Sequence, residues 1–190
     1  MANKNAQDRS EIRLAGEGGQ GMILAGIILA EAAAIFDGKN AAQTQSYGPE
    51  ARGGASKAEV IIAQGDIDHP EVINADVLVA MSQEACDKYA GNLKKTGFLI
   101  VDEEKVGRVP STKAIKVPIT RLAQEASGKA ITANVVALGV LVGLTEVVSR
   151  EAIQKAVTAR APRGTEEMNV KALNAGFEAA GYIKKQLHKN

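Results

Sequence analysis

Short apolar runs alternate with longer helical patterns along the first two thirds of the chain. The run at residues 75–82 (ADVLVAMS) is almost continuously apolar, which is typical of a strand buried on both faces of a parallel sheet. A helical pattern at 83–93 follows this run, and another at 22–36 follows the first strand. Strands are predicted at residues 11–15, 41–48, 55–64, 75–82, 98–104 and 114–119.

Beyond residue 120 the pattern is helical. Helices are predicted at 131–148, 150–161 and 166–187, with Ser149 as the N-cap of the second of them. The fold class is therefore α/β, with three layers in a Rossmann-like arrangement: a largely parallel sheet, helices on both faces, and C-terminal helices that cover the sheet. A chain of 190 residues without an internal repeat or long linker is expected to form a single domain, 1–190.

The most apolar stretch is residues 133–144 (ANVVALGVLVGL). It is shorter than the roughly 20 residues needed to cross a bilayer, so it is expected to be a buried helix or part of an interface, and no membrane association is expected. In the isolated chain, this face is expected to form a homodimer. The first residues lack the apolar core of a signal peptide, and the expected location is cytoplasmic.

Composition narrows the function classes. The formal net charge is +1, which gives no electrostatic reason to expect nucleic acid as a partner. Cys86 is the single cysteine, so this chain cannot hold an iron–sulfur cluster with its own thiolates, and Cys86 is expected to be a packing residue. His69 and His188 have no suitably spaced carboxylate or cysteine, so neither is expected to bind a metal.

A glycine-rich turn, GEGGQG, lies between the first strand and the first helix. Glycine permits backbone angles that other residues avoid, and free amides at a helix start attract anions. The alternative is that the glycines only let the helix pack closely on the sheet. Nicotinamide binding is disfavoured, because the second strand ends without an acidic residue placed to hold a ribose, and Asp37 lies in the turn before that strand. The candidate binding residues of this turn are Gly16, Gly18, Gly19, Gln20 and Gly21.

A second loop, SYGPEARGGAS at 46–56, combines glycine and proline with Tyr47, Glu50 and Arg52. Loops at the carboxyl ends of sheet strands are where open α/β folds usually meet ligands. Tyr47 and Arg52 are candidate binding residues, since an arginine can hold a phosphate through two hydrogen bonds. The alternative is a solvated loop with an incidental ion pair between Glu50 and Arg52. Ser82, after the fourth strand, is expected to be a helix N-cap rather than a site residue.

Three segments, GEGGQGMILAG, QSYGPEARGGASKAEVII and ADVLVAMSQEA, resemble in this order the gamma subunit of 2-oxoacid:ferredoxin oxidoreductases. The resemblance implies a complex that oxidatively decarboxylates a 2-oxoacid to an acyl-CoA and reduces ferredoxin. It further implies that thiamine diphosphate, Mg and iron–sulfur clusters lie on partner chains, namely the alpha, beta and ferredoxin-like delta subunits. By the same resemblance, the glycine turn, Tyr47 and Arg52 are expected near coenzyme A or at a subunit interface, and no catalytic residue is expected on this chain.

The form of the second loop, SYGPEARGG, most resembles enzymes that act on 2-oxoglutarate. The alternatives are branched-chain 2-oxoisovalerate, pyruvate and indolepyruvate oxidoreductases. Two further hypotheses remain open: an independent nucleotide-binding α/β protein that uses the glycine turn, and a purely structural subunit without a ligand contact.

Overall fold

The structure is a computed structural model that describes residues 9–47, 55–110 and 114–187. Its centre is a six-stranded sheet with the strand order β2-β3-β1-β4-β5-β6. The strands are β1 (Arg9–Glu17), β2 (Asn40–Ser46), β3 (Ala55–Ala63), β4 (Ala75–Ala80), β5 (Leu93–Asp102) and β6 (Ile115–Val117). The α-helices are α1 (Met22–Glu31), α2 (Gln83–Tyr89), α3 (Ile119–Ser127), α4 (Ala133–Thr145), α5 (Arg150–Arg160) and α6 (Glu166–Leu187). Short helical turns are η2 (Ala32–Phe36, a π-helix), η3 (Ala90–Asn92) and η4 (Ala130–Thr132).

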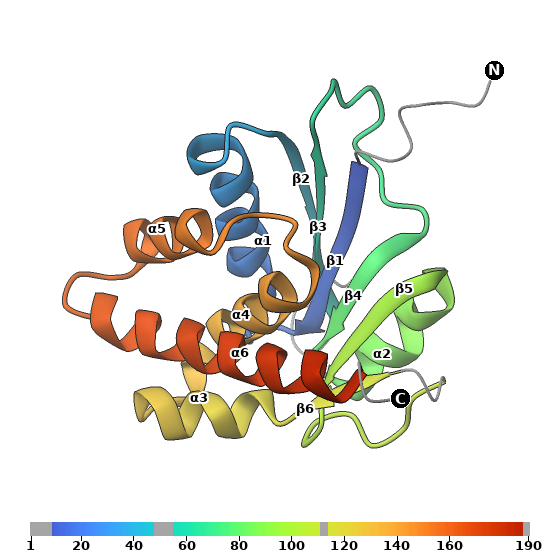
Figure 1. Cartoon of the computed structure of the whole chain (residues 1–190). Coiled ribbons are helices and arrows are strands. Elements are labelled where there is room, and N and C mark those ends of the chain that lie inside the picture. Colours follow the sequence, from blue (N-terminus) through green and yellow to red (C-terminus); the bar gives the residue numbers. More distant parts are fainter. Residues whose placement is uncertain (1–8, 48–54, 111–113, 188–190) are drawn as a thin grey trace.

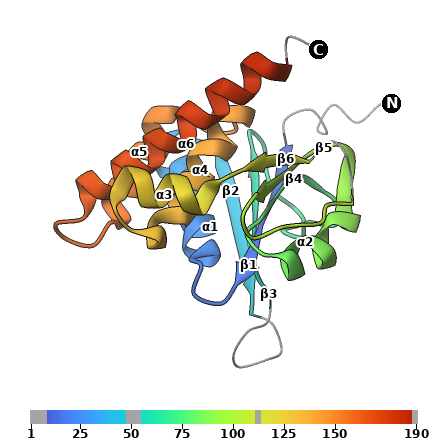
Figure 2. The same cartoon turned by 90° about the horizontal axis from the view of Figure 1, so that it is seen from below.

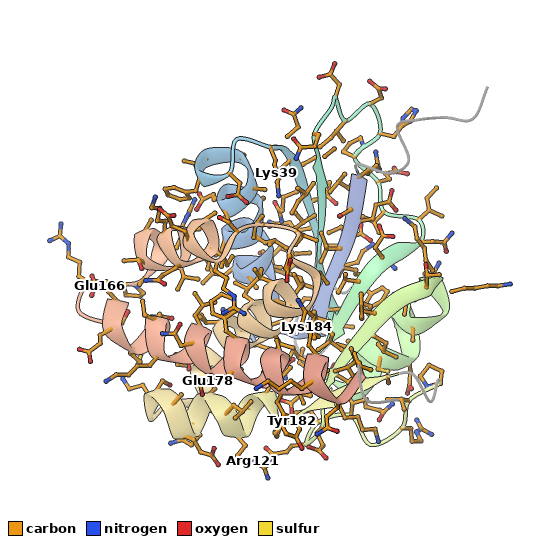
Figure 3. The ribbon with its side chains drawn as sticks, viewed as in Figure 1. Lys39, Arg121, Glu166, Glu178, Tyr182 and Lys184 are labelled. Atoms are coloured by element: carbon orange, nitrogen blue, oxygen red, sulfur yellow. The ribbon has the colours of Figure 1, made fainter. Side chains whose placement is uncertain are left out.

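The sheet separates two helical layers, as Figures 1 and 2 show. Helices α1, α3, α4, α5 and α6 lie on one face, and α2 lies on the other. The predicted three-layer α/β fold with helices on both faces is thereby confirmed. The main apolar core lies between the sheet and the larger helical layer, where side chains fill the space between the ribbons (Figure 3).

One strand departs from the parallel arrangement. β3 is antiparallel to both β1 and β2, whereas β1, β4, β5 and β6 are parallel neighbours. β1 and β2, which α1 connects, run in the same direction, but β3 lies between them in the sheet. Only residues 47–54 connect β2 to β3, and a parallel neighbour would require a crossover of about a dozen residues or more.

Helix α4 is the centre of the larger helical layer. Every residue from 133 to 144 is buried within the chain, so the sequence segment predicted as either a buried helix or an interface is a buried helix. The expected homodimer therefore cannot use this face. Close packing against α6 depends on glycine: a Cβ added to Gly139 would lie 2.9 Å from Cα of Gly176 and would overlap the carbonyl oxygen of Leu173.

Several predicted boundaries shift. The helix expected at 83–93 ends at Tyr89, and β5 includes Lys94, Lys95 and Gly97. The helical pattern after residue 120 contains a separate helix, α3, which ends at Gly128 in a left-handed conformation. The N-caps at Ser82 and Ser149 and the bounds of α6 are confirmed.

The face of the sheet that carries α2 contains a buried ion pair that the sequence pattern did not reveal. The guanidinium of Arg13 donates to Glu59 at 2.7 Å (Nε to Oε1) and to the carbonyl oxygen of Val72 at 2.7 Å. Lys57 also donates to Glu59, and Arg13 lies over the ring of Tyr89. These contacts fix the loop at 65–74, which is largely exposed, to the middle of the sheet.

Candidate functional site

The glycine turn lies where β1 ends and α1 begins. Gly16 and Glu17 belong to β1, so the turn is shorter than the six residues expected from the sequence. Gly21 is the N-cap of α1 and has a left-handed backbone (φ 73°), which disfavours any residue with a Cβ. Among the described residues no side chain caps α1, and its first amides are thus available to an anion.

Gln20 holds the turn in place. Its Oε1 accepts a hydrogen bond from the backbone N–H of Glu17 at 2.8 Å, and its Nε2 donates to the carbonyl oxygen of Met81 at 3.0 Å. The amide therefore links the end of β1 to the residue after β4. A Cβ added to Gly16 would overlap Oε1 of Gln20 and lie 3.2 Å from Cβ of Met81. Glycine at position 16 leaves the space that the Gln20 side chain fills.

Asn134, at the start of α4, supports the turn from the other side. Its Nδ2 donates to the carbonyl oxygen of Gly21 at 3.3 Å, and a Cβ on Gly21 would lie 2.7 Å from the same nitrogen. The side chain is buried, with 6% of its residue surface exposed. The sequence reasoning missed this residue, although it is the single polar side chain in the apolar run 133–144.

The second loop meets the glycine turn through the start of β3. The hydroxyl of Ser56 donates to the carbonyl oxygen of Gly16 at 3.1 Å, and the N–H of Ala55 donates to Glu84 of α2 at 3.2 Å. Tyr47, directly after β2, is 69% exposed. It lies two strands from β1, a separation of about 10 Å. The structure therefore brings the end of this loop, at Ser56, to the glycine turn. Arg52 lies outside the described residues.

Two other groups at the carboxyl ends of the strands have structural roles. Ser82, after β4, accepts a hydrogen bond from the N–H of Ala85 at 3.2 Å and caps α2, as expected. Asp102, fully buried at the end of β5, accepts from the N–H groups of Glu104 (3.1 Å) and Thr120 (3.0 Å) and from the Thr120 hydroxyl. It caps α3. The sequence reasoning missed this acid, because its partner follows 18 residues later.

The remaining candidates do not form a site in the part of the chain that the structure describes. Cys86 is buried, and burial raises the pKa of its thiol, with a further contribution from Asp87. It is the packing residue that was expected. Asp37 accepts hydrogen bonds from the N–H and hydroxyl of Ser149, both at 2.6 Å, and these bonds join it to the start of α5.

Two further kinds of feature are absent from the described residues. These residues contain no group of three or more His, Cys, Asp or Glu side chains arranged to hold a metal ion. None of their helices combines the length and apolar character required to span a bilayer. His69 is exposed, and His188 lies outside the described residues.

Comparison with known proteins assigns the family. Residues 11–179 match the protein family described as "Pyruvate ferredoxin/flavodoxin oxidoreductase". The chain belongs to this family. The match includes the glycine turn, the second loop, most of β1, the other five strands and most of α6, and it confirms the resemblance to 2-oxoacid:ferredoxin oxidoreductases.

Curated members of this family are similar over nearly the whole chain. The 2-oxoglutarate synthase subunit KorC of Methanocaldococcus jannaschii is 50% identical over 184 residues, which are 95% of this chain and 98% of the relative. The ketoisovalerate oxidoreductase subunit VorA of Methanothermobacter thermautotrophicus is 35% identical over 89% of this chain, but only 36% of VorA is covered. The same domain therefore occurs both as a separate subunit and within a longer polypeptide.

Solved structures agree with this assignment. The gamma subunit of a keto/oxoacid ferredoxin oxidoreductase from Geobacter sulfurreducens is 51% identical, with a TM-score of 0.83 over 92% of this chain and 97% of that chain. The 2-oxoglutarate:ferredoxin oxidoreductase of Magnetococcus marinus has a TM-score of 0.81 over 92% of this chain and 31% of that chain. At 22% identity, the second structure shows that the fold is shared.

Proposed function

We propose that this chain is the gamma subunit of a 2-oxoglutarate:ferredoxin oxidoreductase. The observation that carries the proposal is the 50% identity to a 2-oxoglutarate synthase subunit over nearly the full length of both chains. The ketoisovalerate relative is less similar, at 35% identity, and the pyruvate synthase subunit PorC of Methanothermobacter thermautotrophicus is 30% identical. Of the substrates considered, 2-oxoglutarate is therefore favoured.

The chain completes an enzyme whose redox cofactors lie on other subunits. Its single cysteine is buried, with a raised thiol pKa, and is unsuited to ligating a cluster. The described residues also lack a metal-binding group. We infer that alpha and beta subunits and a ferredoxin-like delta subunit supply thiamine diphosphate, Mg and the iron–sulfur clusters. A single reduced cysteine is in keeping with a cytoplasmic complex.

The glycine turn is the part of this chain that is suited to an anionic substrate such as coenzyme A. Three features support this role: the uncapped start of α1, the left-handed Gly21, and the position of the turn beside the start of β3. Both ends of the Gln20 amide bind backbone groups, so we assign Gln20 a positioning role. The turn glycines, with Tyr47 and Arg52 of the second loop, are the groups proposed to contact coenzyme A.

The test is an assay of the complex purified under anaerobic conditions through an affinity tag on this chain. Ferredoxin reduction is measured with 2-oxoglutarate, 2-oxoisovalerate, pyruvate and indolepyruvate, each with and without coenzyme A. The expected result is co-purification of a thiamine diphosphate subunit and the highest kcat/KM with 2-oxoglutarate. A higher kcat/KM with another of these acids would reassign the substrate. A tagged chain that binds no such subunit would overturn the proposed function.

A further inference from the structure

The two edges of the sheet differ in how far they are protected against pairing with another strand. Edge β6 has only three residues, one of them Lys116, and pairs with β5 at Ile100 to Asp102. The exposed part of β5 carries Lys94 and Lys95 and has an irregular register against β4. Short strands, lysines and irregularities are the usual features that prevent edge pairing.

The edge formed by β2 has none of these features. All seven residues from Asn40 to Ser46 pair in regular register with β3, and the strand sequence NAAQTQS contains no charge, proline or glycine. In the part of the chain that the structure describes, no strand lies on the outer side of β2. Its outward backbone groups form a regular ladder that another strand can extend.

We propose that β2 pairs with β2 of a second copy of this chain, antiparallel about a twofold axis at Gln43, so that one sheet continues through both molecules. This register places Gln43 opposite Gln43 of the second copy, Ala42 opposite Thr44, and Asn40 opposite Ser46. Because the strand is uncharged, self-pairing opposes no like charges, and the interface is isologous.

Apolar residues at both ends of β2 support a second copy of this chain as its partner. Tyr47, directly after the strand, is 69% exposed, and Ile35, in the π-helix that precedes the strand, is 66% exposed. In an antiparallel pair the end of one strand meets the beginning of the other. Tyr47 of each copy is thereby brought beside the π-helix of the other copy, where Ile35 loses contact with water.

Gln43 is the position that tests the proposal. It lies on the twofold axis, is half-buried, and makes only local hydrogen bonds, to the carbonyl oxygen of Thr44 (3.2 Å) and to Gln45 (3.5 Å). Gln43→Lys and Gln43→Glu each place like charges opposite each other in the dimer, and within the monomer they change only the two local hydrogen bonds of the Gln43 amide. An equimolar mixture of the two variants instead places opposite charges together.

The experiment is sedimentation velocity of the full chain over a wide concentration range. The expected result is a wild-type dimer, a dissociation constant raised at least about tenfold in each Gln43 variant, and recovery in the mixture. Asn174→Lys and Asn174→Glu, on the exposed face of α6, are the matched controls and leave the dimer unchanged. Circular dichroism verifies that each variant folds.

Hydrogen exchange of the wild-type chain provides an independent measurement. The amides of β2 are expected to exchange more slowly as protein concentration rises, because the dimer protects them. The proposal is overturned by a wild-type monomer at all concentrations, by a dimer that both Gln43 variants leave intact, or by concentration-independent exchange in β2. If the β2 amides are protected only after other subunits are added, the proposed homodimer is overturned and the edge pairs with one of those subunits.

Discussion

Gly16 and Gln20 are sterically coupled: the Gln20 amide occupies the space in which a Cβ of residue 16 would lie. That amide joins the end of β1 to the residue after β4 by two hydrogen bonds. The shape of the glycine turn therefore depends on one missing side chain and one present side chain, four residues apart.

Gly16→Ala is expected to displace the Gln20 amide and to lower the free energy of unfolding by about 1–3 kcal/mol, the cost of losing its two hydrogen bonds. Gln20→Ala removes the same bonds. The double variant should therefore lose less stability than the sum of the two single variants in urea unfolding. Gly18→Ala is the control, because nothing lies within 4 Å of a Cβ at that position. Additive losses at 16 and 20 would contradict the coupling.

Gly139→Ala is expected to force α4 and α6 apart, since the added methyl group would meet the backbone at Leu173 and Gly176. Overpacking of this kind costs typically about 1–3 kcal/mol, and backbone contacts place the loss at the upper end of that range. The measurement is the midpoint of thermal or urea unfolding. Gly181→Ala, on the facing helix α6, meets nothing within 4 Å and should stabilise that helix by up to about 1 kcal/mol. Equal effects at the two positions would refute the close contact.

The ionised carboxyl of Asp37 is expected to make the free energy of unfolding depend on pH. Burial alone raises the pKa of this carboxyl, but the hydrogen bonds from Ser149 and the nearby Lys39 outweigh it, and the pKa is lowered from its ordinary value. A lowered pKa contributes stability that is present above the unfolded value, about 3.9, and is lost as the pH falls through the folded value.

Asp37→Asn should therefore reduce the free energy of unfolding by roughly 1 kcal/mol at neutral pH, since charged hydrogen bonds are replaced by neutral ones. The difference from wild type should shrink as the pH falls below about 4. Urea unfolding of both proteins at a series of pH values measures this difference in the free energy of unfolding. Asp66→Asn, in the exposed loop at 65–74, is the control. A difference that grows toward acid pH would show that the sign is wrong.

Arg52→Ala tests the proposed contact with coenzyme A in the assembled complex. Loss of a charge-assisted hydrogen bond to a phosphate should raise the KM for coenzyme A by about tenfold or more, with little change in the KM for the 2-oxoacid. Arg163→Ala, an exposed arginine between α5 and α6, is the control. An unchanged KM with intact assembly would favour a purely structural role for the second loop.

The sequence by itself determined the features that depend on neighbouring residues. The apolar run of β4, the N-caps at Ser82 and Ser149, and the full extent of α6 follow from local periodicity and capping chemistry. The three-layer fold class follows from the alternation of these elements. The glycine turn was located correctly between β1 and α1, because its composition is set by the local backbone.

Only the tertiary structure decided how distant segments share space. The insertion of β3 between β1 and β2, the burial of α4 on all sides, and the contacts of Asn134 and Asp102 join residues far apart in the sequence. Local pattern shows that a residue is apolar or polar, but it does not show which partner removes it from water. The free energy of burial and of buried hydrogen bonds is shared between both partners, and it is defined only when the chain brings them together.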